Sequence, residues 1–430
     1  RAPLALRVNR RVATQEALME VVHRNCGGID VHARVVVVCS RVVSNEGVNR
    51  EVRSYGTDTG GLLAVREWLQ SRGCTHVVME STGVYWKPVW HILSTAGSFE
   101  LVLANAQHVK AVPGRKRDVS DAVWLADLQA HGLIRGSFVP PPEVAELRSL
   151  MRTRKQLVRE RTSHTQRIQK TLEEANVKLD SAISDVLGQS GRAMLEAMIA
   201  GESDPKRLAE LASPRIKASP ETLMRALDGR LTEVHRVLLR IHLDQIEALD
   251  RSIAVIERRA EDRLDPFREA VELIVTIPGM GERSARAVLG EIGIDMSRFP
   301  TEGQFMSWGC MVPRNDESAG RRRSSRLRPG GNWLKTTMVQ CAWAAVRKTD
   351  CRFAALFARL KPRSGAGRAI CAVAAEMLRT IYHMLKDGTF YEERRAELRQ
   401  ETREQEAKRL LRRLARLGFT AEIKLVASAA

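Results

Sequence analysis

The chain has 430 residues and a mass of 48.1 kDa, which is too long for one ordinary domain and suggests about three. Its 44% hydrophobic and 28% charged residues are typical of a globular protein and exclude disorder for most of the chain. The net charge of +18 favours a polyanionic partner, and nucleic acid is the first candidate. Residues 25–140 hold 12 basic and 10 acidic side chains, a net of +2, and residues 1–24 add +3, so +13 of this charge lies beyond residue 140.

The seven cysteines and the lack of long apolar runs exclude several other classes of protein. No two cysteines have the spacing C-x-x-C, so neither a disulfide framework nor a zinc site is expected, and a reducing cytosol fits. No apolar run approaches the ~20 residues that span a bilayer. The N-terminal segment also lacks the apolar core of a signal peptide. We therefore expect a soluble intracellular protein without a membrane partner.

The first part of the chain predicts an α/β sheet. Apolar, β-branched runs alternate with helical segments, which favours a sheet covered by helices on both faces. We expect a strand or strand pair at 27–39, a helix at 59–70, and strands at 75–81 and 99–105. The Val139-Pro140-Pro141-Pro142 step ends this domain as a stiff linker, because helices rarely continue through proline.

After the linker, apolar residues recur at helical spacing in two long runs. The first starts at Leu147 and the second runs from Leu231 to Ile256, and both are typical of coiled-coil or αα-hairpin seams. The first helix also carries many basic residues with few acids between them. Its Arg152, Lys155 and Arg159 are about as likely to meet phosphate as water.

A third unit begins near residue 270 with the sequence IPGMG at 277–281, followed by a helix. This pattern resembles a helix-hairpin-helix turn, in which Gly279 and Gly281 would let backbone N–H groups approach a phosphate. A simple glycine-rich turn explains the pattern about equally well. The final forty residues predict a charged helical tail without a catalytic role.

Four carboxylates stand out by their position. Asp30 lies within a predicted strand, where a charge is rare unless it is paired or bound to a metal, and Glu80 ends another. Asp118 and Asp121 are three residues apart, which would place them on one helical face. Such acids can converge to hold two hard cations that act on a phosphodiester. In the alternative interpretation Asp118 caps a helix and Asp121 is merely exposed. Asp127, in the second turn of the same helix, is not counted among the candidate metal ligands.

The segment 311–332 combines serines with many arginines and few apolar residues. Five of the eight residues from 321 to 328 are arginines, which predicts a bound phosphate because arginine supplies bidentate donors. A serine here could attack phosphorus only if its weak hydroxyl were activated. We expect phosphate contacts from two basic groups, in addition to the helix above: Arg115, Lys116 and Arg117, and Arg321, Arg322, Arg323, Arg326 and Arg328.

Taken in order, these motifs resemble the DEDD-type transposases of insertion sequence family 110. The first domain contributes GGIDVHA, MESTGVYW and NAQHVKAVPGRKRDVSDAVWLADL. The third unit contributes IPGMGERSA, FMSWGCMVPRNDESAG and PGGNWLKTTMV. Together these motifs cover nearly everything from 25 to 385.

The resemblance implies a fold of α/β plus α. Its segments would be an N-terminal extension (1–24), a RuvC-like, RNase-H-type DEDD domain (25–138), a helical coiled-coil spacer used in oligomerisation (143–265), a mostly helical C-terminal transposase domain (270–390) and the tail (391–430). It also implies catalysis by Asp30, Glu80, Asp118 and Asp121 as metal ligands, with two Mg²⁺ or Mn²⁺ ions, and by a serine nucleophile.

That serine corresponds to Ser318 in VPRNDESAG. Ala319 stands where the family usually has glycine, and Arg328 replaces a second serine. Ser324 and Ser325 remain weaker candidates.

The resemblance further implies donor and target DNA as partners, with a non-coding bridge RNA that pairs with both. It implies a homodimer or homotetramer that is located in the bacterial cytoplasm and associated with the nucleoid. Two alternatives stay open: a RuvC-like, metal-dependent, structure-specific nuclease in which water attacks, and a non-catalytic nucleic-acid-binding protein.

Overall fold

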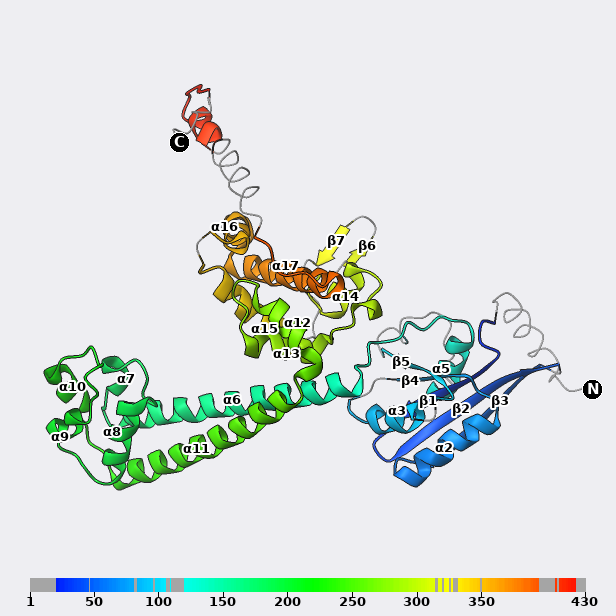
Figure 1. Ribbon diagram of the computed structural model, residues 1–430, viewed down its shortest axis with the longest axis horizontal. Helices are drawn as coiled ribbons and strands as arrows, with labels where there is room; N and C mark the ends of the chain where they lie inside the picture. The colour runs from blue at the N-terminus through cyan, green and yellow to red at the C-terminus, as the bar shows by residue number, and fades with distance from the viewer. Residues whose placement is uncertain are drawn as a thin grey trace, which may run out of the picture. The chain divides into compact units, whose positions relative to one another are not determined.

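The computed structural model divides the chain into two compact units, Arg1–Val139 and Pro140–Ala430 (Figure 1). It describes residues 21–45, 47–80, 83–95, 97–105, 109, 120–313, 316–318, 321–324, 326–327, 332–348, 350–393, 407 and 410–422. The first unit is mixed α/β and the second is mostly helical, which confirms the expected fold class at this coarse level.

A five-stranded sheet forms the centre of the first unit, in the order β3-β2-β1-β4-β5. Its strands are β1 (Asn25–Val31), β2 (Val35–Ser44), β3 (Gly47–Gly56), β4 (His76–Glu80) and β5 (Glu100–Ala104). β1, β2 and β3 form an antiparallel meander, whereas β4 runs parallel to both β1 and β5. The β-branched run of β2 suits its place between two strands, because branched side chains pack well on a pleated surface.

Helices cover both faces of this sheet. On one face α2 (Thr59–Ser71) and α3 (Trp86–Ser94) pack against Ile29, Val38 and Met79. On the other face α5 (Asp121–Ala130) packs against Val78 through Leu125. The sheet is therefore buried on both sides.

The strand β3 was not predicted from the sequence. It is an edge strand whose residues are all exposed or only partly buried, and its sequence GVNREVRSYG lacks the apolar alternation that marks a half-buried strand. It forms because it pairs with β2 along its whole length, from Ser44 opposite Gly47 to Val35 opposite Gly56. The ladder of backbone hydrogen bonds compensates for the polar sequence.

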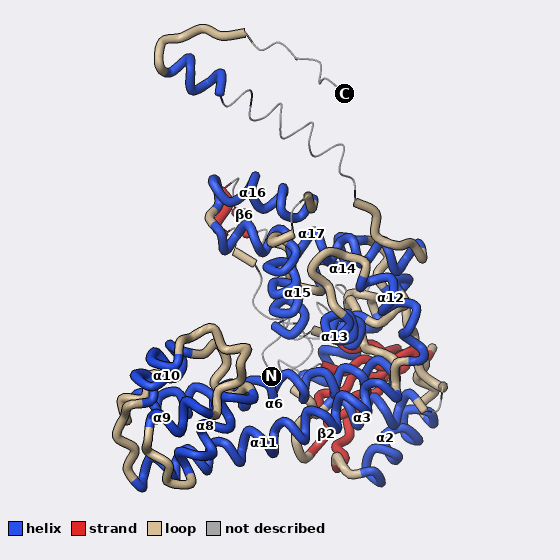
Figure 2. The backbone as a smooth tube through the Cα atoms, turned by 60° about the vertical axis from the view of Figure 1, so that its left-hand side comes forward, coloured by secondary structure: helices blue, strands red, loops and turns tan. Residues whose placement is uncertain are grey.

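Two long antiparallel helices, α6 (Pro142–Glu174) and α11 (Glu233–Asp262), form the first part of the second unit. The ion pairs of Arg154 with Glu257 and of Arg161 with Asp250 connect them. Figure 2 shows short helices gathered where α6 ends and α11 begins. These are α7 (Leu179–Ala182), α8 (Gln189–Ile199), α9 (Pro205–Glu210) and α10 (Pro220–Leu227). They share a hydrophobic core with the adjoining ends of α6 and α11.

The apolar face of α11 differs in part from the predicted seam. Leu239, Leu243 and Ile246 are buried, whereas Val234 and Ile241 of the predicted seam are exposed. The sequence offers two apolar stripes on this helix, and packing against α6 and α8 covers only one of them.

The rest of the second unit includes the long helix α17, whose apolar residues Ile370, Val373, Met377 and Ile381 are buried and which packs against α12, α14, α15 and α16. Its elements, in chain order, are η1 (Asp265–Phe267), α12 (Arg268–Val275), α13 (Glu282–Ile292), η2 (Met296–Arg298), α14 (Glu302–Trp308), β6 (Asp316–Ser318), β7 (Arg321–Ser324), α15 (Asn332–Ala345), α16 (Arg352–Ser364) and α17 (Ala366–Asp387). Among the described helices of both units, none is long and apolar enough to cross a membrane.

Candidate functional site

Two of the predicted acidic residues lie at the carboxyl ends of neighbouring parallel strands. The register of β1 and β4 places Ile29 beside Met79, so Asp30 and Glu80 take the next position on each strand. Residues that are side by side in a parallel pair point to the same face of the sheet. Both acids are partly exposed, and the side chain of Asp30 retains 21% of its accessible surface.

Helix α5 covers that same face. Gly28 lies two residues before Asp30, and a Cβ atom added to it would lie 2.2 Å from the carbonyl oxygen of Ala122 and 2.5 Å from the nitrogen of Ala126. Only glycine therefore allows α5 to cross β1 this closely. Because side chains alternate along a strand, Asp30 shares the face of Gly28.

Asp121 is the first residue of α5 and precedes Ala122 directly. The N-cap of the helix is Ser120, whose hydroxyl oxygen accepts a hydrogen bond from the backbone N–H of Val123 at 3.4 Å. The close crossing at Gly28 thus brings the start of α5 to the end of β1. Asp30, Glu80 and Asp121, which are far apart in the sequence, lie at one end of one sheet face.

These oxygen donors have the chemistry that Mg²⁺ and Mn²⁺ prefer. Asp30 Oδ2 lies 3.1 Å from His32 Nε2. Within the described part of the chain, no group of three or more His, Cys, Asp or Glu side chains is arranged to hold a metal ion. The fourth predicted ligand, Asp118, lies outside the described residues, as do Arg115, Lys116 and Arg117.

The arginine-rich segment contains a two-stranded hairpin. β6 and β7 pair with Ser318 opposite Arg321, and a register shift lies between Asp316 and Glu317. A further bridge joins Pro313 to Leu327. The backbone of Ser318 is thus at the last paired position before the turn, with arginines on the returning strand, while Ser325 and Arg328 lie outside the described residues.

Two family models match this chain. Residues 27–177 match a DEDD transposase model of IS110 elements, described as "Transposase", and residues 271–358 match the "Transposase IS116/IS110/IS902 family". Together the two matches cover more than half of the chain. The chain belongs to the IS110 family of transposases. It is therefore a DNA transposase, and the predicted family is confirmed.

Three relatives agree with this assignment. The chain is 27% identical to a probable family 20 transposase of Pseudomonas aeruginosa, over 67% of this chain and 78% of that protein. It is 26% identical to the insertion element IS110 uncharacterized 43.6 kDa protein of Streptomyces coelicolor, over 68% and 76%. It is 25% identical to the transposase for insertion sequence element IS1111A of Coxiella burnetii, over 73% and 78%.

In this transposase the basic residues predicted on α6 make contacts inside the second unit. Arg152 donates two hydrogen bonds to Glu291, at 2.7 and 2.8 Å, and Glu291 itself is buried. Lys155 Nζ donates to the hydroxyl of Thr336 at 2.5 Å, and its burial lowers the pKa of its ammonium group. Arg159 lies 5.4 Å from the ring centre of Trp333. These contacts attach α6 to α13 and α15, and phosphate binding by the three residues stays a prediction.

The two glycines of the predicted phosphate-binding turn have different surroundings. The turn does connect two helices, α12 and α13. Gly279 has a φ of +84°, and a Cβ there would lie 2.5 Å from backbone atoms of Cys341 and Ala345, so close packing against α15 requires this glycine. Gly281 has open space around its Cα and forms the N-cap of α13 without a side-chain hydrogen bond.

Sequence reasoning missed one ionic group of the transposase. Arg41 in β2 is 1% exposed, and its Nε donates to Asp127 Oδ1 of α5 at 3.0 Å. Arg50 of β3 donates to the same oxygen at 3.0 Å. A buried arginine requires a carboxylate partner, so these contacts connect α5 to β2 and β3. The only signal in the sequence was an arginine within the apolar run of β2.

Proposed function

We propose that this transposase cuts and rejoins DNA at a carboxylate tetrad and a nucleophilic serine. Asp30, Glu80, Asp118 and Asp121 are the proposed metal ligands, and Ser318 is the proposed nucleophile. The observation that carries the proposal is that Asp30, Glu80 and the start of α5 with Asp121 lie at the same end of one sheet face. The sheet, with β4 and β5 parallel to β1, is compatible with a RuvC-like, RNase-H-type domain.

The tetrad would hold two Mg²⁺ or Mn²⁺ ions, which when bound neutralise charge on a scissile phosphate. The partial exposure of Asp30, Glu80 and Asp121 supports this role, because ligands of a substrate-facing ion must remain accessible. Asp121 would be positioned by the Ser120 cap and by the packing of Ala122 over Gly28.

In the proposed reaction the hydroxyl of Ser318 loses its proton and its Oγ forms a bond to phosphorus. One P–O ester bond of the DNA strand breaks, and the released deoxyribose hydroxyl takes up a proton. The phosphoserine link conserves the energy of the broken bond, so a hydroxyl of another strand can reverse the step without ATP. Arginines 321, 322, 323, 326 and 328 are proposed to contact the backbone at this phosphate.

The partners of the reaction are proposed to be donor DNA, target DNA and a bridge RNA that pairs with both. Base pairing would then read the sequence, while the protein would read backbone shape. The charge of +13 beyond residue 140 supports binding of a polyanion to the second unit.

A homodimer or homotetramer is also proposed. Four apolar side chains remain exposed along the start of α11 at helical spacing: Val234, Val237, Leu238 and Ile241. The α11 helix of a second copy could cover this stripe as in a coiled coil. Sedimentation of the protein as a single monomeric species would contradict the oligomer.

A trapped covalent adduct tests the proposed chemistry. Wild-type protein incubated with DNA and Mg²⁺ should give a denaturant-resistant protein–DNA adduct, and Ser318→Ala should eliminate it. Ser324→Ala is the matched control on the same hairpin and should keep the adduct. An adduct that survives Ser318→Ala would move the nucleophile elsewhere. Metal-dependent cleavage without any adduct in the wild type would instead favour the nuclease, in which water attacks.

A further inference from the structure

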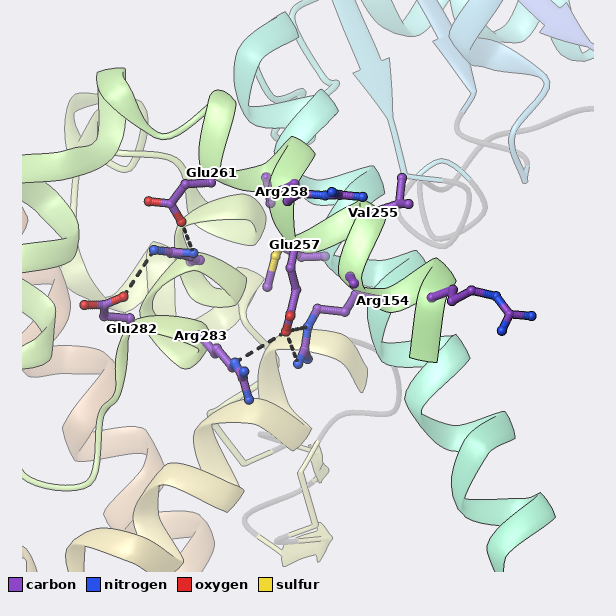
Figure 3. A pocket seen from close by; sticks show the side chains of 12 residues that line it. Arg154, Val255, Glu257, Arg258, Glu261, Glu282 and Arg283 are labelled. Atoms are coloured by element: carbon purple, nitrogen blue, oxygen red, sulfur yellow. Dashed lines mark hydrogen bonds and ion pairs between the residues drawn. The ribbon is translucent and has the colours of Figure 1, made fainter. Parts of the chain in front are cut away.

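A hollow of about 810 Å³ opens in the second unit, among the last turns of α11, the first half of α6 and the first turns of α13 (Figure 3). None of the residues proposed for catalysis lines it. Five arginines and three glutamates line it, so its charge is positive. We call it the α11–α13 groove.

The three glutamates of the groove are all engaged in ion pairs. Glu257 Oε1 lies 2.7 Å from a guanidinium nitrogen of Arg154 and 3.4 Å from one of Arg283. Arg286 pairs with both Glu261, at 2.6 Å, and Glu282, at 3.1 Å. Figure 3 shows these contacts as dashed lines. The carboxylates are therefore neutralised by three of the five arginines.

The remaining two arginines, Arg251 and Arg258, have no such partner. Both are exposed side chains of α11 that line the groove. Among the described residues neither makes an ion pair or a side-chain hydrogen bond. They are seven residues apart and so lie on one helical face, about 10.5 Å apart along the axis at 1.5 Å per residue.

The floor between the two charges is apolar. Val255 lies between Arg251 and Arg258 in the sequence and is one of the exposed large apolar residues, and Ala254 and Met151 also line the groove. An apolar floor flanked by separated guanidinium groups suits a chain of phosphates joined by sugars, since the sugars can pack while each phosphate accepts hydrogen bonds.

We propose that the α11–α13 groove binds the phosphate backbone of a nucleic-acid strand, with Arg251 and Arg258 contacting two separate phosphates. The proposal rests on the proposed function only in assuming that nucleic acid is the ligand of the second unit. Single-stranded DNA, duplex DNA and folded RNA share this backbone chemistry, and the experiment distinguishes them.

The test compares Arg251→Gln/Arg258→Gln with the wild-type protein in equilibrium binding to three fluorescent probes. The probes are a 20-nucleotide DNA strand, a 20-base-pair DNA duplex and an RNA hairpin of similar size, each titrated over a range of salt concentrations. Loss of two phosphate contacts should make the slope of log K against log salt shallower by about 1.8 for the duplex or about 1.4 for the single strand. The probe that shows the change identifies the strand that lies in the groove.

The matched control is Arg215→Gln/Lys217→Gln, which removes the same charge from exposed positions between α9 and α10, outside the groove. It should leave the slope unchanged. An equal change in the control would show a general effect of net charge and overturn the proposal. An unchanged slope of the groove variant with all three probes would also overturn it, and binding of an acidic peptide there would then identify a protein partner.

The outcome is separable from that of the proposed reaction. Asp30→Asn, which addresses cleavage, should leave the slope of log K against log salt unchanged, whereas the groove variant should make that slope shallower. Loss of cleavage without a change in the salt slope therefore tests the role of the carboxylates, and a change in the salt slope tests nucleic-acid binding in the groove.

Discussion

Asp30 is the residue at which the proposed chemistry can be tested most directly. Its carboxylate is partly exposed, and among the described residues it forms an ion pair only with the exposed His32. Replacement by asparagine should abolish Mg²⁺-dependent nicking of supercoiled DNA because a ligand charge is lost. Without metal, relief of repulsion among carboxylates should offset loss of the weak surface pair, so the free energy of unfolding should change by less than about 1 kcal/mol or rise.

Plasmid nicking and thermal unfolding in EDTA measure the two effects of Asp30→Asn. Glu67→Gln is the matched control, because it removes one carboxylate charge from the exposed side of α2. The control should keep wild-type nicking. Wild-type nicking by Asp30→Asn would remove Asp30 from the metal site.

At the scale of elements, the position of α5 depends on the ionic group formed by Asp127, Arg41 and Arg50. Asp127→Asn would leave the buried guanidinium of Arg41 without a countercharge. Removing one partner of a buried ion pair lowers the free energy of unfolding by about 3–5 kcal/mol. The loss here should be near the lower end of that range because Asp127 is 24% exposed. Chemical denaturation followed by tryptophan fluorescence measures this loss.

Arg50→Gln is the control for this element. Its side chain is partly exposed, and it leaves the Arg41–Asp127 pair in place, so it should cost about 1 kcal/mol or less. Equal losses for the two variants would show that the buried pair does not hold α5 in position.

At the scale of the whole molecule, the proposed bridge RNA predicts a change of specificity without a change of protein. Purified protein freed of RNA should bind duplex DNA with little sequence preference, because phosphate contacts carry no sequence information. Adding the structured RNA encoded beside the gene should allow recombination at matching sites, and changing a few guide-loop bases should redirect it. Sequencing of the recombination products measures both effects.

The control for the guide is an RNA of equal length and base composition with its loop sequence scrambled. It should bind the protein but support no recombination at the original site. Efficient, site-specific recombination by protein without RNA would contradict the proposal and indicate a transposase that reads DNA directly.

Much of the fold was predictable from the sequence because the signals were local. Apolar β-branched runs predicted strands near β1, β2, β4 and β5, and Asp30 and Glu80 were recognised as charges within or at the end of such runs. β3 could not be predicted, since its stability comes from pairing with β2 rather than from its own residues. Likewise, the sequence of α11 offers two apolar stripes, and only packing decides which one is buried.

The sequence by itself determined the family, through ordered motifs, and the excess of positive charge beyond residue 140. Only the tertiary structure decided which residues meet. Gly28 carries no chemistry, yet its missing side chain lets α5 bring Asp121 to the end of β1. The charges of Arg152 and Arg251 look alike in the sequence, but Glu291 pairs with the first and no described residue pairs with the second. Charge is a property of the residue, whereas its neutralisation depends on partners that folding brings from distant parts of the chain.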